Sequence, residues 1–149
     1  MTKLLPVLAV ALAALALGAM ADAAGQRTTS VRLSASLTAD AQVPVSKNVP
    51  AAAIATFTAT LVGNSLKWTL SFSHLGSEAI AAQIRLGAPG KSGATLIPLC
   101  GPCRSPSSLT ANPTTSEITA LKAGKAYVDI FTAKNPNGEI RGQITLVQS

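Results

Sequence analysis

Two neighbouring stretches of the chain alternate strictly between apolar and polar residues, and this alternation constrains the fold more than any other feature. The apolar members, at every second position, are Ala55, Phe57, Ala59 and Leu61, then Leu66, Trp68, Leu70 and Phe72. Successive side chains of a β-strand point to opposite faces, so this period predicts two strands that each bury one face. The segment between them, 62–65 (VGNS), has the glycine and asparagine of a tight turn.

The same alternation returns towards the C-terminus. Its apolar positions are Ala126, Val128 and Ile130, followed by Ile140, Ile144 and Leu146. Residues 135–138 (NPNG) lie between the two groups and predict a second turn. About eight or nine short strands at regular spacing predict an all-β fold, an antiparallel sandwich or barrel.

One segment, residues 76–87 (GSEAIAAQIRLG), fits both a helix and a strand. Its good helix formers, a capping serine at Ser77 and the spacing of Ile80 and Ile84 favour a helix. As a strand, it would place Ile80, Ala82, Ile84 and Leu86 on one side. Local propensity alone favours the helix.

The N-terminus has the pattern of a secretory signal peptide, predicted over residues 1–23. A basic residue, Lys3, precedes the apolar run 4–19, and small residues follow at A-x-A spacing, which allows cleavage after Ala21, Ala23 or Ala24. The run is shorter than the ~20 residues of a spanning helix, so we expect no stable membrane anchor after cleavage. We therefore expect an exported protein, extracellular or periplasmic, with a flexible start at 24–30 and one domain at 31–149.

The charge balance is basic, with 12 Lys and Arg against 6 Asp and Glu among 149 residues. The basic residues are scattered, and aromatic residues make up only 3% of the chain, so no cationic stripe or stacking platform for nucleic acid is present in the sequence. We expect no nucleic-acid partner, and at most weak attraction to anionic envelope or matrix polymers.

Both cysteines lie in the tetrapeptide CGPC, residues 100–103, which is also the active-site sequence of thioredoxins. A reactive CxxC begins a helix, whose N-terminus lowers the pKa of the first thiol. Here residues 104–116 are rich in serine, threonine and proline and have no amphipathic period. We predict a structural Cys100–Cys103 disulfide and keep a thiol–disulfide redox protein as the alternative function.

Residues 121–144 (LKAGKAYVDIFTAKNPNGEIRGQI) resemble the closing signature of the CHRD (chordin) domain. The matching positions are Leu121, Gly124, Tyr127, Val128, Thr132, Pro136, Gly138, Glu139, Ile140, Arg141, Gly142 and Gln143. Segments 37–45 and 81–99 match the family more loosely, so that the resemblance covers residues 31–147. It implies an extracellular, all-β, antiparallel Greek-key β-sandwich, immunoglobulin-like or superoxide-dismutase-like, and a strand at residues 79–86. In chordin this domain belongs to a secreted protein that sequesters growth factors.

Many members of that family carry three histidines at positions where this chain has Gln83, Arg85 and Phe131. An arginine offers no lone pair to a metal, so we expect no cofactor and no family-type metal site. A superoxide-dismutase-like metalloprotein is the weaker alternative. The single histidine, His74, is expected to be a surface bystander in a turn.

Three charged residues of the signature are candidates for either recognition or structure. Glu139 and Arg141 are two apart on one predicted strand, and Asp129 on its partner strand is placed to form an ion pair with Arg141. We expect cross-strand pairing that fixes the register and find no catalytic motif. The sequence therefore predicts a secreted, non-enzymatic CHRD-domain protein that binds an unidentified extracellular protein or glycan.

Overall fold

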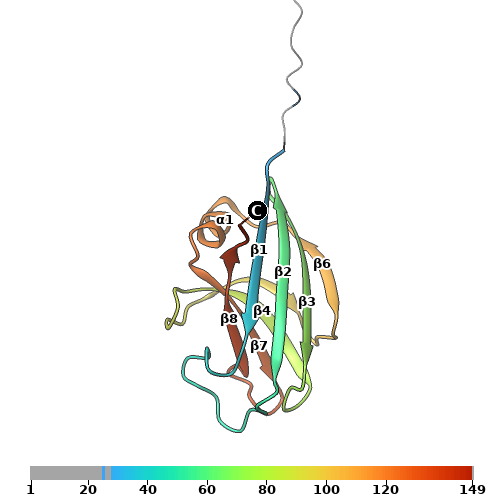
Figure 1. Ribbon diagram of the computed structural model, residues 1–149, viewed down its shortest axis with the longest axis vertical. Coiled ribbons are helices and arrows are strands. Elements are labelled where there is room, and N and C mark those ends of the chain that lie inside the picture. The colour runs from blue at the N-terminus through green and yellow to red at the C-terminus, as the bar shows by residue number, and fades with distance from the viewer. Residues whose placement is uncertain (1–24, 26–27, 149) are drawn as a thin grey trace, which may run out of the picture.

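The computed structural model describes Gly25 and residues 28–148 of the chain. The predicted signal peptide lies outside these residues, as does part of the predicted flexible start. Within the described residues, nine strands form two antiparallel sheets that pack face to face, and one short helix connects two of the strands (Figure 1). The predicted all-β sandwich is confirmed, and β1 begins at Ser30, next to the predicted start of the domain.

The first sheet has five strands in the order β6-β3-β2-β1-β9. Their bounds are β1 Ser30–Leu37, β2 Ile54–Val62, β3 Ser65–Ser73, β6 Ser107–Ala111 and β9 Thr145–Leu146. The β2–β3 hairpin turns at Gly63, whose φ of 59° is left-handed and suits a glycine. This is the turn that the sequence predicts between the two alternating stretches.

The second sheet has four strands in the order β5-β4-β7-β8. Their bounds are β4 Ala79–Leu86, β5 Thr95–Cys100, β7 Ala126–Thr132 and β8 Ile140–Gln143. The chain changes sheet between β3 and β4, between β5 and β6, between β6 and β7, and between β8 and β9. The end of β1, at Ser36 and Leu37, lies against Gly142 of β8, and the next residue, Thr38, bridges to Arg141.

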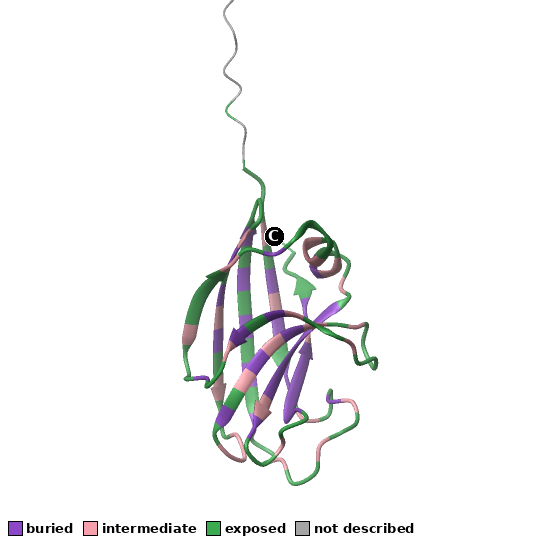
Figure 2. Cartoon of the chain, turned by 180° about the vertical axis from the view of Figure 1, so that it is seen from behind, coloured by how far each residue is buried: buried purple, intermediate pink, exposed green. Residues whose placement is uncertain are grey.

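The core lies between the sheets and contains the apolar halves of the alternating strands. Trp68, Phe57 and Leu70 are each at most 2% exposed, and the threonines between them face solvent. Figure 2 shows this as alternating buried and exposed bands along the strands of the first sheet. The predicted inward faces of β2 and β3 are therefore confirmed, except that Phe72 is half-buried.

Segment 79–86 is a strand, as the family resemblance implies and against the local helix propensity. Only Ala82 and Ile84 of its predicted apolar side are buried. A register shift between Ala79 and Ala81 turns Ile80 outward, and Leu86 at the end of the strand is 42% exposed. The expectation that all four residues lie on one side is therefore wrong for Ile80, because a bulge interrupts the alternation there.

Two further features differ from the sequence pattern. Ile140 and Leu146, which the alternation assigns to one strand, belong to two strands. The chain leaves the second sheet after Gln143 and pairs with β1 as β9, and Leu146 is 44% exposed.

A helix, α1 (Thr115–Lys122), lies between β6 and β7. Thr114 and Glu117 form a capping box at its start, and Leu121 is its buried residue. Within the described residues, no helix is long and apolar enough to cross a membrane.

Candidate functional site

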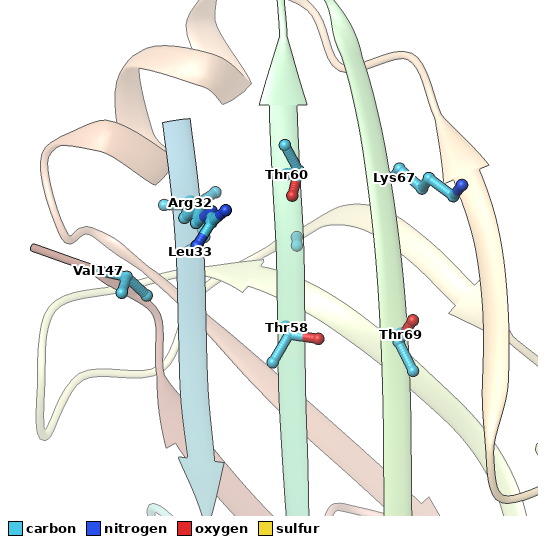
Figure 3. Close-up of a pocket in the computed structure, with 8 residues that line it drawn as sticks. Arg32, Leu33, Thr58, Thr60, Lys67, Thr69 and Val147 are labelled. Carbon is cyan, nitrogen blue, oxygen red and sulfur yellow. The ribbon is translucent and has the colours of Figure 1, made fainter. Parts of the chain in front are cut away.

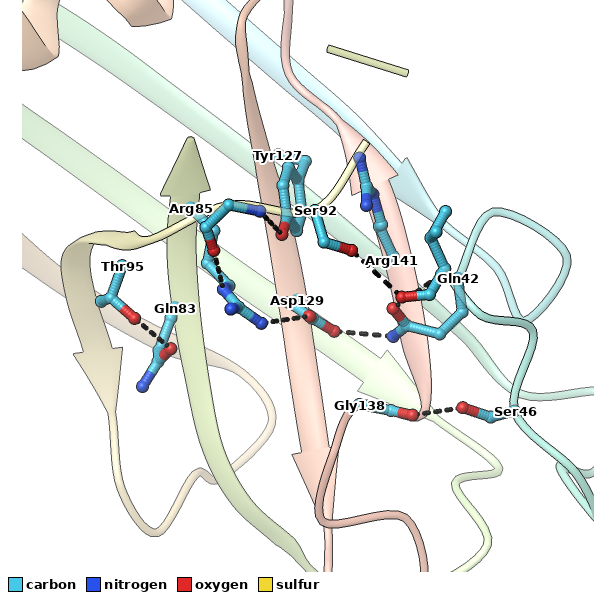
Figure 4. A network of polar contacts seen from close by, with 12 residues as sticks. Gln42, Ser46, Gln83, Arg85, Ser92, Thr95, Tyr127, Asp129, Gly138 and Arg141 are labelled. Carbon is cyan, nitrogen blue, oxygen red and sulfur yellow. Dashed lines mark hydrogen bonds and ion pairs between the residues drawn. The ribbon is translucent and has the colours of Figure 1, made fainter. Parts of the chain in front are cut away.

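The outer face of the four-stranded sheet carries a polar network centred on Asp129 of β7. Its carboxylate accepts a hydrogen bond from Nε2 of Gln42 (2.7 Å) and forms an ion pair with Arg85 of β4 (3.4 Å; Figure 4). Arg141 lies opposite Asp129 in the strand register, as expected, but the ion pair that the structure shows comes from Arg85. The predicted pairing with Arg141 is replaced because the Arg141 side chain extends towards a loop.

Arg141 holds the β4–β5 loop against the sheet. Its guanidinium carbon lies 3.4 Å from the centre of the Tyr127 ring, and Nη2 donates to the carbonyl oxygens of Ala88 (3.2 Å) and Lys91 (2.7 Å). The hydroxyl of Tyr127 accepts from the backbone nitrogen of Gly93 (3.2 Å). With Arg141 only 2% exposed, the loop covers the part of this face that surrounds Arg141.

Glu139 is fully buried and binds a different pair of chain segments from those that Asp129 and Arg141 contact. Its carboxylate accepts hydrogen bonds from the backbone nitrogen of Gly76 (3.0 Å), the hydroxyl of Thr132 (3.0 Å) and the side-chain amide of Asn135 (3.1 Å). These bonds join the β3–β4 connection to the β7–β8 turn. Asp129, Glu139 and Arg141 therefore hold loops in place, and each is at most 2% exposed.

Burial has an electrostatic consequence for Asp129. Desolvation raises the pKa of its carboxyl above the ordinary 3.8, while the Gln42 amide and the two arginines act in the opposite direction. Desolvation also lowers the pKa of Arg141. The network is thus a buried polar cluster that stabilises one arrangement of two loops, 39–46 and 87–94.

The positions of the family histidines gather beside this network. Gln83 and Arg85 on β4 and Phe131 on β7 line a shallow hollow of about 400 Å³, together with Ile80, Ala81, Pro136 and Asn137. The guanidinium of Arg85 lies 5.8 Å from the centre of the Phe131 ring. Among the residues the structure describes, no group of three His, Cys, Asp or Glu side chains is placed to hold a metal ion. His74 lies in the exposed turn after β3.

The cysteine pair forms a disulfide at the end of β5. The two sulfur atoms are 2.04 Å apart, and the backbone nitrogen of Cys103 donates to the carbonyl oxygen of Ala79. Strand β6 follows this loop, and α1 begins only at Thr115. Neither cysteine lies at a helix N-terminus, which is the position that makes a thioredoxin thiol reactive.

The outer face of the five-stranded sheet is open and consists mostly of hydroxyl side chains. We name it the hydroxyl face. Its rows across the sheet are Ser36–Thr56–Ser71, then Ser34–Thr58–Thr69–Ser108, then Arg32–Thr60–Lys67–Thr110. All of these side chains are exposed or half-buried. On the other sheet, loops cover the part of the outer face around Asp129 and Arg141, whereas no such loop contact is made to the rows of the hydroxyl face within the described residues.

A hollow of about 270 Å³ lies on the hydroxyl face. Thr58, Thr60 and Thr69 line it, with Arg32 and Lys67 on the two flanking strands (Figure 3). Within the described residues, neither cation is in a salt bridge. None of the five strands of this sheet contains an Asp or Glu residue. The hollow therefore offers hydroxyl donors and acceptors between two positive charges.

Sequence reasoning did not select this hollow. The Thr-x-Thr-x-Thr pattern at 56–60 predicts the polar side of an amphipathic strand, but it does not by itself indicate a binding site. Arg32 and Lys67 are 35 positions apart (67 − 32), and only the register of three strands brings them to either side of Thr60.

The fold and its buried polar network define a class of antiparallel β-sandwich in which buried charged residues hold loops against one sheet. The model of the CHRD domain family matches residues 33–144, so the protein belongs to the CHRD domain family. Comparison with curated proteins and with solved structures gave no match.

Proposed function

We propose that this CHRD-domain protein is an exported, non-enzymatic binding module that attaches to extracellular or envelope material through its hydroxyl face. The observation that carries the proposal is the difference between the two sheets. The loop anchored by Arg141 and Tyr127 covers part of one sheet, whereas the other sheet presents ordered rows of hydroxyl groups with two cations.

Three other features support it. The signal-peptide pattern and the disulfide fit an oxidising compartment outside the cytosol. The charged residues of the family signature are already engaged in hydrogen bonds within the protein, so they fit a structural role. The positions of the family histidines hold Gln83, Arg85 and Phe131, which do not favour metal chemistry.

A retention assay on insoluble envelope or matrix material from the producing organism tests the proposal. The Thr58→Glu/Thr60→Glu variant introduces two negative charges into the centre of the hydroxyl face, and we expect it to lose retention. Asn137→Glu places a charge beside the hollow of the other sheet and serves as the control. We expect this control to be retained like the wild type.

Equal retention of the hydroxyl-face variant and the wild type would show that the module binds elsewhere. Retention lost only in the Asn137 variant would move the binding site to the hollow at Phe131. Absence of any retention of the wild type would refute the proposed attachment. Unfolding curves of both variants, followed by the fluorescence of the buried Trp68, separate lost binding from lost folding.

A further inference from the structure

We propose that the hydroxyl face binds an acidic polysaccharide, with Arg32 and Lys67 contacting acidic groups on the sugar chain and threonine hydroxyls contacting its hydroxyl groups. This inference rests on the proposed function and names the class of ligand for that face.

The placement of charge is the first argument. Arg32, Thr60 and Lys67 are directly paired across β1, β2 and β3, so the two cations are separated by two strand spacings, roughly 10 Å at the backbone. Both side chains are exposed, and the structure shows no salt bridge to either within the described residues. A linear polymer with acidic groups at intervals along its length matches this pair of isolated positive charges.

The hydroxyl groups between the cations are the second argument. Thr58 and Thr60 are exposed, and their side chains, with that of Thr69, lie along the hollow between Arg32 and Lys67 (Figure 3). Each hydroxyl both donates and accepts hydrogen bonds, which is the same capacity that sugar hydroxyls have. The threonine methyl groups add small apolar contacts suited to the carbon–hydrogen edges of a sugar ring.

The chemistry of the face disfavours other macromolecules. Stable protein interfaces are centred on buried aromatic or large apolar anchors, and the middle rows of the hydroxyl face have none. Single-stranded nucleic acids need aromatic side chains on which bases stack, and the only aromatic residues of these strands point inward. A flat, hydrophilic face with two cations is best matched by a hydrated acidic polymer.

Polygalacturonate, a linear polysaccharide with a carboxylate on every sugar, is the direct probe. We expect the purified protein to bind it in calorimetry or affinity electrophoresis and to bind its methyl-esterified form weakly or not at all. Because exposed charges are screened by salt, we expect the affinity to fall as NaCl rises from about 50 to about 300 mM.

Five variants resolve the contributions. We expect Arg32→Gln or Lys67→Gln to weaken binding about three- to tenfold, and the double variant to remove detectable binding. Lys47→Gln/Lys134→Gln removes the same charge at exposed positions off the sheet and should bind like the wild type. Thr58→Val keeps a strand-forming side chain without its hydroxyl, and we expect a loss of about two- to fivefold.

Several outcomes would overturn the inference. Equal binding of the methyl-esterified polymer would refute the role of charge, and equal weakening by the Lys47/Lys134 control would reduce the effect to net charge. Binding to anionic vesicles, DNA or an acidic protein, but not to polygalacturonate, would overturn the ligand class. In that case, if retention on envelope or matrix material still depended on Thr58 and Thr60, the proposed function of the hydroxyl face would still be supported.

Discussion

Gly142, the glycine of the closing signature, lies where β8 runs closest to β1. A Cβ atom on this residue would lie 2.7 Å from the carbonyl carbon of Ser36 and 3.0 Å from the backbone nitrogen of Leu37, and closer still to the Ser36 carbonyl oxygen. All three are backbone atoms, so no side-chain rotation relieves the clash. We predict that Gly142→Ala separates the two strands locally.

The expected magnitude follows from three contributions. Overpacking costs about 1–3 kcal/mol. The two backbone hydrogen bonds between Thr38 and Arg141, each 3.0 Å long, are the nearest links between these strands, and their loss adds roughly 1 kcal/mol apiece. The smaller entropy of the unfolded alanine chain offsets about 0.5–1 kcal/mol. The net loss is about 2–4 kcal/mol, a large share of the ~5–15 kcal/mol typical of a domain.

Urea unfolding followed by the fluorescence of Trp68, the one tryptophan and 2% exposed, measures this loss directly. Gly63→Ala is the matched control, because its Cβ meets nothing within 4 Å but its φ of +59° strains an alanine. We expect the control to lose only about 1 kcal/mol. A Gly142→Ala protein as stable as the wild type, or more stable than the control, would refute the steric explanation of the signature glycine.

Two further predictions concern the buried carboxylate and the disulfide. Because the pKa of Asp129 is raised above 3.8, the folded state keeps a proton that the unfolded chain releases between 3.8 and the raised value, so its contribution to the free energy of unfolding falls as pH rises through that interval. Asp129→Asn should lack this decline, and parallel urea-derived stability profiles of the two proteins from acidic to neutral pH would contradict the assignment. Cys100→Ser/Cys103→Ser should lower the free energy of unfolding by about 2 kcal/mol and leave polygalacturonate binding unchanged. An insulin-reducing activity present in the wild type and lost in this variant would instead support the redox alternative.

Residues that follow a local rule were predictable from the sequence. The period of two in β2 and β3 placed Phe57 and Trp68 in the core, and glycine at position 63 marked the turn between them. Helix α1 was missed although its capping box, Thr114 with Glu117, is legible in the sequence. Its single buried residue, Leu121, gave no amphipathic period to support the cap.

Features that depend on distant parts of the chain were not predictable in the same way. Gln42 reaches Asp129 across 87 positions of sequence, and no local pattern marks such a contact. Segment 79–86 has helix propensity, but pairing with β5 and β7 on either side makes it a strand, since tertiary hydrogen bonds outweigh small local preferences. The candidate binding face likewise needed the register, because spacing in sequence does not relate Arg32 to Lys67.

The two sheets are connected differently along the two long sides of the sandwich, so the sides differ in how strongly they resist separation of the sheets. On one side, β1 continues into Thr38, which exchanges two backbone hydrogen bonds with Arg141 of the other sheet. On the opposite side, β5 and β6 each end their sheet, and the chain crosses through the disulfide loop, where Cys103 bonds to Ala79 and Ser105 to Phe72. We therefore expect local unfolding of lowest free energy to begin at the β5–β6 side, and the Cys100–Cys103 link to limit how far the chain extends when it does.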